Sequence, residues 1–170
     1  VESGQTAPLD TVRLLFTADL QSKVLPGKAQ GVEAGKAESE MGGFTRLMTV
    51  LERQREDMPS VTLSAGDDLM GRFFRQFKGK ATFALMDAMG YEVICPGNHE
   101  LDLGEKVYGE ALQGTSFDVI LANVTFADES LKQRIIPRVI KEVGNYKIGF
   151  FGLIIPYLRT STSIAPETQV

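Results

Sequence analysis

The chain has 170 residues, and its 18 Lys and Arg against 22 Asp and Glu give a formal net charge of −4. A hydrophobic share of 43% and a charged share of 24% are typical of globular proteins and exclude global disorder. The mildly acidic balance argues against nucleic acid or anionic membrane as a partner, because broad binding to either needs a basic surface. The longest apolar run, 148–155, is too short to span a membrane. A single cysteine, Cys95, excludes an internal disulfide and a cysteine-rich zinc site.

The first part of the chain predicts a strand, a long irregular stretch and a helix. Residues 1–11 are polar and small, which indicates a loose N-terminal lead-in. An apolar, β-prone run predicts a buried strand over 12–18. The stretch 19–43 has no clear period, and loops of this length in compact domains are usually functional or mobile. Apolar residues at helical spacing then predict an amphipathic helix over 44–56.

The remaining chain continues the alternation and ends with a hairpin. The predicted elements are a strand over 61–65, a helix over 81–89 closed by Gly90, a strand over 91–95, a helix over 105–112 and a strand over 117–121. Two further strands, 135–143 and 146–155, flank Gly144-Asn145, which is a two-residue hairpin signal. The pattern predicts an α/β fold: a layered, mostly parallel sheet with covering helices and a C-terminal β-hairpin.

Polar clusters follow three successive strands of the predicted sheet. They are Asp19-Leu20-Gln21, Gly66-Asp67-Asp68 and Gly97-Asn98-His99-Glu100. In parallel sheets, ligands bind beyond the carboxyl ends of the strands, so we expect the three clusters to face one crevice. This convergence is the main functional signal in the sequence.

The acidic members of these clusters are candidate metal ligands. Asp19 and Asp67 supply hard carboxylate oxygens that suit divalent cations, and Asn98 adds a neutral carbonyl oxygen. A cation would also remove the repulsion between two neighbouring carboxylates. Each Asp taken alone is more simply explained as a cap of a turn or helix. The occurrence of such residues at three strand ends favours the metal site.

The only histidine of the chain, His99, lies in the third cluster. It is a candidate proton donor or transition-state stabiliser, because imidazole changes charge near neutral pH. A solvent-exposed loop histidine is the alternative interpretation. Asp102, three residues later, could hold the imidazole in one tautomer, and it could equally cap the helix predicted from residue 105.

These residues carry a family resemblance. Gly66-Asp67-x-x-x-Gly71 followed by Gly97-Asn98-His99-Glu100 resembles the signature of the calcineurin-like metallophosphoesterases. The segments 15–20, 42–47, 62–71 and 89–104 resemble more narrowly the N-terminal catalytic domain of the 5′-nucleotidase branch. That branch includes UDP-sugar hydrolases and 2′,3′-cyclic-nucleotide phosphodiesterases. The resemblance extends, with gaps, over about residues 12–155.

The resemblance implies a two-metal phosphoesterase. It makes Asp19 a ligand of the first metal, Asp67 the carboxylate that bridges both metals, and Asn98 a ligand of the second metal. Gln21 stands where the family has a histidine ligand of the first metal. His99 is implied as the group that stabilises the transition state, with Asp102 as its partner.

The same resemblance implies the cofactors and partners. The cofactors would be two divalent ions, drawn from zinc, manganese, magnesium and calcium. The substrate would be a nucleotide or another small phosphoester, and the location periplasmic, secreted or on the cell surface.

Two departures from the family pattern bear on activity. A glutamine carbonyl at position 21 is a weaker and less selective ligand for transition metals than imidazole. No histidine follows His99, whereas the family's remaining metal histidines lie downstream. We therefore expect residues 12–170 to be the N-terminal part of a metallophosphoesterase domain, inactive when isolated and lacking the C-terminal part of the same protein.

Two other interpretations remain. The chain could come from a non-catalytic relative that kept the fold and lost binding of the first metal, as Gln21 suggests. A generic Rossmann-like nucleotide binder is less favoured, because Asp19-Leu20-Gln21 follows the first strand where a G-x-G-x-x-G loop would be needed.

Overall fold

The structure of the protein is a computed structural model that describes residues 11–28 and 40–170. The predicted lead-in over 1–11 therefore lies outside the described residues, except for Thr11. Residues 29–39 of the long stretch over 19–43 also lie outside them. The described parts of that stretch pair as a small antiparallel ribbon of β2 (Gly27–Lys28) and β3 (Glu40–Met41).

Five strands form one parallel sheet in the order β1-β4-β5-β6-β7. The strands are β1 (Arg13–Thr17), β4 (Ser60–Ser64), β5 (Val93–Ile94), β6 (Asp118–Ile120) and β7 (Ile135–Ile136). The helices along the chain are α1 (Phe44–Arg55), α2 (Gly71–Phe77), α3 (Lys80–Ala88), the 3-10 turn η1 (His99–Leu101), α4 (Glu105–Ala111), α5 (Glu129–Arg134) and α6 (Leu158–Ser161). The predicted α/β class is confirmed.

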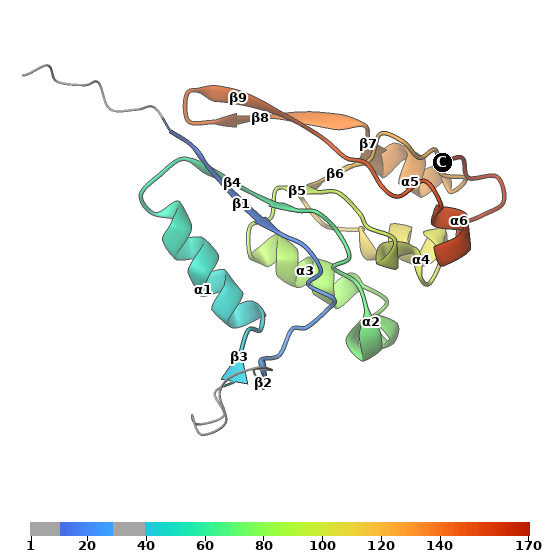
Figure 1. Cartoon of the computed structure of the whole chain (residues 1–170), viewed down its shortest axis with the longest axis horizontal. Coiled ribbons are helices and arrows are strands. Elements are labelled where there is room, and N and C mark those ends of the chain that lie inside the picture. Colours follow the sequence, from blue (N-terminus) through green and yellow to red (C-terminus); the bar gives the residue numbers. More distant parts are fainter. Residues whose placement is uncertain (1–10, 29–39) are drawn as a thin grey trace, which may run out of the picture.

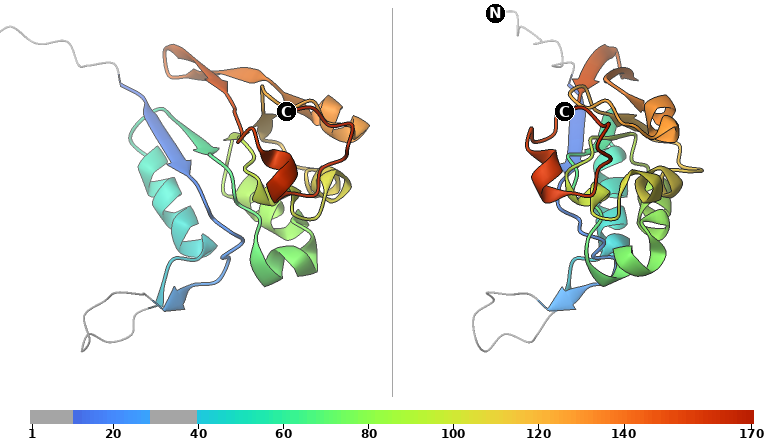
Figure 2. Two further views of the ribbon diagram at one scale, coloured as in Figure 1. Left: turned by 45° about the vertical axis from the view of Figure 1, so that its right-hand side comes forward. Right: turned by 90° about the vertical axis from the view of Figure 1, so that its right-hand side faces the viewer.

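The sheet separates two unlike layers. Helices α1 and α3 lie on one side of it, and the antiparallel hairpin of β8 (Arg138–Val143) and β9 (Tyr146–Phe151) lies on the other (Figures 1 and 2). On the helical side, the ring of Phe83 packs against those of Tyr108 and Phe117, with centroid distances of 6.1 and 5.7 Å. All three side chains are buried, so this aromatic cluster ties α3 and α4 to the start of β6.

The predicted hairpin is confirmed around Gly144-Asn145, where Val143 pairs with Tyr146. The single strand predicted over 135–143 is wrong, because it is split into β7 and β8 at Pro137. Proline has no N–H to donate, and the two halves join different sheets: β7 pairs with β6, and β8 pairs with β9. The strand predicted over 146–155 ends earlier, at Phe151.

The strand predicted over 12–18 occurs as β1, but its predicted burial is wrong: β1 is an edge strand, and Leu14 and Phe16 are 48% and 70% exposed. The other predicted elements occur with shifted ends. The strand predicted over 91–95 is reduced to the two residues of β5, while α1, α3, α4, β4 and β6 lie within one or two residues of their predicted bounds. Helices α2, α5 and α6 were not predicted. Among the described residues, no helix combines the length and apolar character that crossing a membrane would need.

Candidate active site

The loops that follow β1, β4 and β5 are hydrogen-bonded to one another. The N–H of Asp19 donates to the carbonyl of Gly66 at 2.9 Å, and the N–H of Gln21 donates to the carbonyl of Asp67 at 3.1 Å. The N–H of His99 donates to Oδ1 of Asp67 at 3.0 Å. The three sequence clusters therefore meet at the carboxyl end of the sheet, as their positions after parallel strands predict.

Two glycines permit this close approach. A Cβ atom on Gly66 would overlap the backbone of Cys95, Pro96 and Gly97, and one on Gly97 would overlap the carboxylate of Asp67. Gly66 also has a φ of 95°, a backbone conformation that residues with a side chain rarely adopt. Glycine at these two motif positions lets the loops after β4 and β5 pack backbone against backbone.

The backbone is strained at the candidate ligands. Asp19, Gln21, Ser22 and Asp67 have φ values of 56°, 50°, 51° and 55°, in the left-handed region. Residues other than glycine hold this conformation only where the surroundings enforce it, and such strain gathers at functional sites. The left-handed conformation of these four residues therefore lowers the local stability of the two loops.

His99 and Asp102 form a pair at the surface of this loop cluster. Nδ1 of His99 lies 3.0 Å from Oδ2 of Asp102. This hydrogen bond raises the pKa of His99, and the charges of Asp102, Asp67 and Asp19 add to the effect against a smaller opposing contribution from burial. The candidate metal ligands Asp19 and Asp67 are thus close enough for their charges to favour the protonated form of the imidazole. The geometry brings Asp102 to His99, while the catalytic role of the pair stays a prediction.

Two buried acids complete the cluster, and sequence reasoning gave neither a role. Asp68 has no exposed surface and accepts a hydrogen bond from Oγ of Ser64 at 2.6 Å. Burial raises the pKa of Asp68 to about 6, and the neighbouring charges of Asp67 and Asp19 add to this rise. Burial likewise raises the pKa of Glu100, and the hydrogen bonds that it accepts from the N–H groups of Leu69 and Gly97 oppose this rise by stabilising the carboxylate. The signal in the sequence was their position: Asp68 belongs to the Gly66-Asp67-Asp68 cluster and Glu100 to the Gly97-Asn98-His99-Glu100 cluster, and each is an acid without a predicted role.

The oxygen donors of the cluster fit a divalent ion in part. Asp19, Gln21, Asp67 and Asn98 come from the three joined loops, and their carboxylate and amide oxygens suit hard cations. Beside them, Oδ1 of Asp68 is buried without a hydrogen-bond partner among the described residues. Within 11–28 and 40–170, however, no three His, Cys, Asp or Glu side chains are grouped to hold a metal. The described residues thus offer part of a ligand set.

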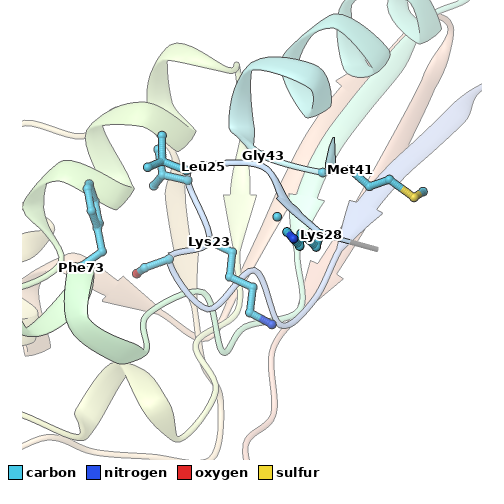
Figure 3. Close-up of a pocket in the computed structure, with 10 residues that line it drawn as sticks. Lys23, Leu25, Lys28, Met41, Gly43 and Phe73 are labelled. Atoms are coloured by element: carbon cyan, nitrogen blue, oxygen red, sulfur yellow. The ribbon is translucent and has the colours of Figure 1, made fainter. Parts of the chain in front are cut away.

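Two clefts adjoin the cluster on the side of α1 and α2. One, of about 460 Å³, is lined by Lys23, Leu25 and Met41 with Phe73 of α2 at its far end (Figure 3). The other, of about 450 Å³, includes Asp19 itself. Its remaining lining combines two cations with apolar side chains: Lys23, Arg46, Leu20, Phe44, Leu47 and Val50.

Comparisons with known proteins identify the family of the chain. A family model described as calcineurin-like phosphoesterase matches residues 12–155. The 5′-nucleotidase of Mus musculus is 30% identical over 146 residues, which cover 82% of this chain and 25% of that protein.

Solved structures are similar over nearly the whole chain. The 5′-nucleotidase precursor of Thermus thermophilus has a TM-score of 0.84 and 28% identity, and the match covers 92% of this chain and 31% of that one. The NAD nucleotidase NadN of Haemophilus influenzae has a TM-score of 0.83 and 27% identity, covering 92% and 32%. The chain spans about a quarter to a third of the length of these relatives. It belongs to the calcineurin-like phosphoesterase family, and proteins named 5′-nucleotidase are among its relatives.

Proposed function

We propose that the chain is the N-terminal part of the catalytic domain of a longer, metal-dependent hydrolase that acts on nucleotides or related small phosphoesters. The observation that carries the proposal is the placement of the His99–Asp102 pair against Asp67, in a cluster where loops from three parallel strands are hydrogen-bonded together. The names of the relatives support nucleotides as the substrate class. The resemblance to the 5′-nucleotidase branch supports a periplasmic, secreted or cell-surface location.

The proposed roles follow from the chemistry of each side chain. Asp19, Gln21, Asp67 and Asn98 would hold two divalent ions together with ligands from the rest of the protein. Two such ions supply an activated water and neutralise charge on the phosphoryl group. His99 would donate a hydrogen bond or proton to the phosphoryl oxygen where charge develops. Asp102 would hold the imidazole by Nδ1, and this hydrogen bond favours the protonated form, which is why the pKa of His99 is raised.

The cleft beside Asp19 supports a nucleotide rather than a bare phosphate. Its two cations, Lys23 and Arg46, suit the negative charge of a phosphoester, and its apolar wall suits a nucleoside. Its position next to a candidate metal ligand would place a bound substrate near the proposed reaction centre.

The test uses the full-length protein that contains this chain. After removal of metal with a chelator, the protein should hydrolyse 5′-AMP only when manganese or zinc is restored. UDP-glucose and 2′,3′-cyclic AMP, assayed in parallel, would assign the substrate. A protein that binds metal but hydrolyses none of these three substrates would contradict the proposal that it is an enzyme. It would favour the second candidate, a non-catalytic relative, to which Gln21 in place of histidine points.

A further inference from the structure

We propose that Glu100 is a positioning residue whose buried carboxylate fixes the loop that carries Asp67 to the loop that carries Asn98. The metal-ligating role of those two residues is part of the function proposed above, so this inference rests on it. Glu100 itself is 1% exposed, and it therefore reaches neither solvent nor a substrate. Its effect on the site acts through the backbone that it holds.

The hydrogen bonds of Glu100 join both loops. Its Oε2 accepts from the N–H of Asp67 at 3.0 Å and from the N–H of Gly97 at 2.6 Å. Its Oε1 accepts from the N–H of Leu69 at 2.9 Å. One carboxylate thus satisfies three backbone donors, two in the loop after β4 and one in the loop after β5. The residues so held are Asp67 itself and the immediate neighbour of Asn98.

These bonds counter two sources of instability in the loops. Asp67 has a left-handed φ of 55°, which is unfavourable for a residue with a side chain unless the surroundings enforce it. The Gly66 and Gly97 segments also approach more closely than any side chain would allow. The bridge from Asp67 Oδ1 to the N–H of His99 adds a single further bond between the loops. Glu100 is therefore the main side-chain link that sets their spacing.

The site requires a carboxylate rather than an amide. Three N–H donors converge on two oxygens, and both oxygens must accept. A glutamine offers one acceptor oxygen and one NH2 donor, so at least one backbone N–H would face another donor. Buried donors left without an acceptor destabilise the local structure, and the loops would shift to restore hydrogen bonding.

Glu105 provides a matched control for the same substitution. It is 6% exposed and also accepts three hydrogen bonds, from the N–H groups of Asp128 and Ala165 and from the hydroxyl of Thr168. None of these donors belongs to the three strand-end loops. Glu105→Gln therefore removes a similar buried acceptor without touching Asp67 or Asn98.

The experiment compares Glu100→Gln, Glu100→Asp and Glu105→Gln in the full-length protein. Manganese affinity is measured by calorimetric titration of the metal-free protein, and thermal stability by calorimetry. Amide hydrogen exchange in the absence of metal reports directly on the N–H groups of Asp67, Leu69 and Gly97.

We expect Glu100→Gln to weaken manganese binding about 10- to 100-fold, which is the usual effect of losing a residue that supports metal ligands. Exchange at the three amides should become faster. Glu100→Asp keeps both oxygens and should lie between Glu100→Gln and the wild type, which preserves the test if Glu100→Gln does not fold. Glu105→Gln should lower the melting temperature while it leaves manganese affinity and the three amides unchanged.

Wild-type manganese affinity and wild-type exchange in both Glu100 variants would overturn the proposal. Equal loss of manganese affinity in Glu105→Gln would also overturn it, because the effect would then come from general destabilisation. A wild-type protein that binds neither manganese nor zinc would instead refute the proposed function, and this inference with it. The two failures are therefore distinguishable.

Discussion

The backbone N–H of His99 donates a hydrogen bond to the carboxylate of Asp67, yet the two side chains should affect different properties of the enzyme. We predict that His99→Ala in the full-length protein keeps its metal and lowers turnover by ~10²–10³, as expected for loss of one donor to a developing oxyanion. The Michaelis constant should change little, because the interaction forms mainly in the transition state. Turnover, Michaelis constant and bound metal are to be measured on the same preparation.

Asp67→Ala is the comparison variant. It removes the proposed bridging carboxylate, so both metal content and rate should fall. A His99→Ala protein that loses its metal would make His99 a ligand and contradict its assignment. Unchanged phosphatase activity in both variants would remove the catalytic interpretation altogether.

For single residues, the sequence predicted which strand-end residues lie close together, but it did not predict the hydrogen bonds that fix their positions. Asp19, Asp67 and Asn98 follow parallel strands, so topology alone indicates that they meet. The role of Glu100 depends on which backbone N–H groups its oxygens reach, and neither hydrophobic period nor motif spacing encodes that. The sequence could not predict the unpartnered oxygen of Asp68 either, because this feature arises from the burial of Asp68 between loops.

Among the elements, α5 depends on a cap that can be tested separately from the active site. The side chain of Asp128 accepts hydrogen bonds from the N–H groups of Ser130 and Leu131 at the start of the helix. We predict that Asp128→Ala lowers the free energy of unfolding by about 1 kcal/mol at neutral pH, the usual effect of losing an N-cap. Urea denaturation of the wild type and the variant gives this difference.

The same cap makes a small part of the stability pH-dependent. The hydroxyl of Ser130 lowers the pKa of Asp128, with smaller contributions from the two N–H groups. The folded-state pKa is thus below the unfolded value of about 3.9. This stability is present above that pH and is lost as the pH falls through the folded-state pKa. Asp128→Asn keeps a capping oxygen without the charge, so its difference from the wild type should disappear in acid. A difference that grows in acid would contradict the assignment.

Elements with a clear apolar period were predicted, and those shaped by tertiary contacts were not. The helical spacing over 44–56 and the Gly144-Asn145 turn are local signals, and α1 and the β8–β9 hairpin confirm them. Helix α2 is only seven residues long, and Lys78 in the left-handed region ends it. The division between β7 and β8 depends on which partner strand is nearby, and Pro137 was its only sign in the sequence.

Across the whole molecule, the proposed metal ligands lie along the carboxyl edge of the sheet, and the described residues offer only part of a ligand set. The described residues contribute two carboxylates and two amides from three loops, and no grouping of three His, Cys, Asp or Glu side chains occurs among them. The match covers only 25% to 32% of the length of these relatives. Further ligands are therefore expected from the rest of such a protein.

We predict that the 170-residue chain alone binds divalent metal weakly and hydrolyses nucleotides little or not at all. Few protein ligands leave an ion mostly hydrated, and metal affinity depends on a complete, preformed set. Calorimetric titration with manganese and with zinc, on this chain and on the full-length protein, measures the difference, and circular dichroism confirms that the isolated chain is folded. Tight binding of two ions by the folded chain would show that Asp19, Gln21, Asp67 and Asn98 suffice. The proposed dependence on the rest of the protein would then be wrong.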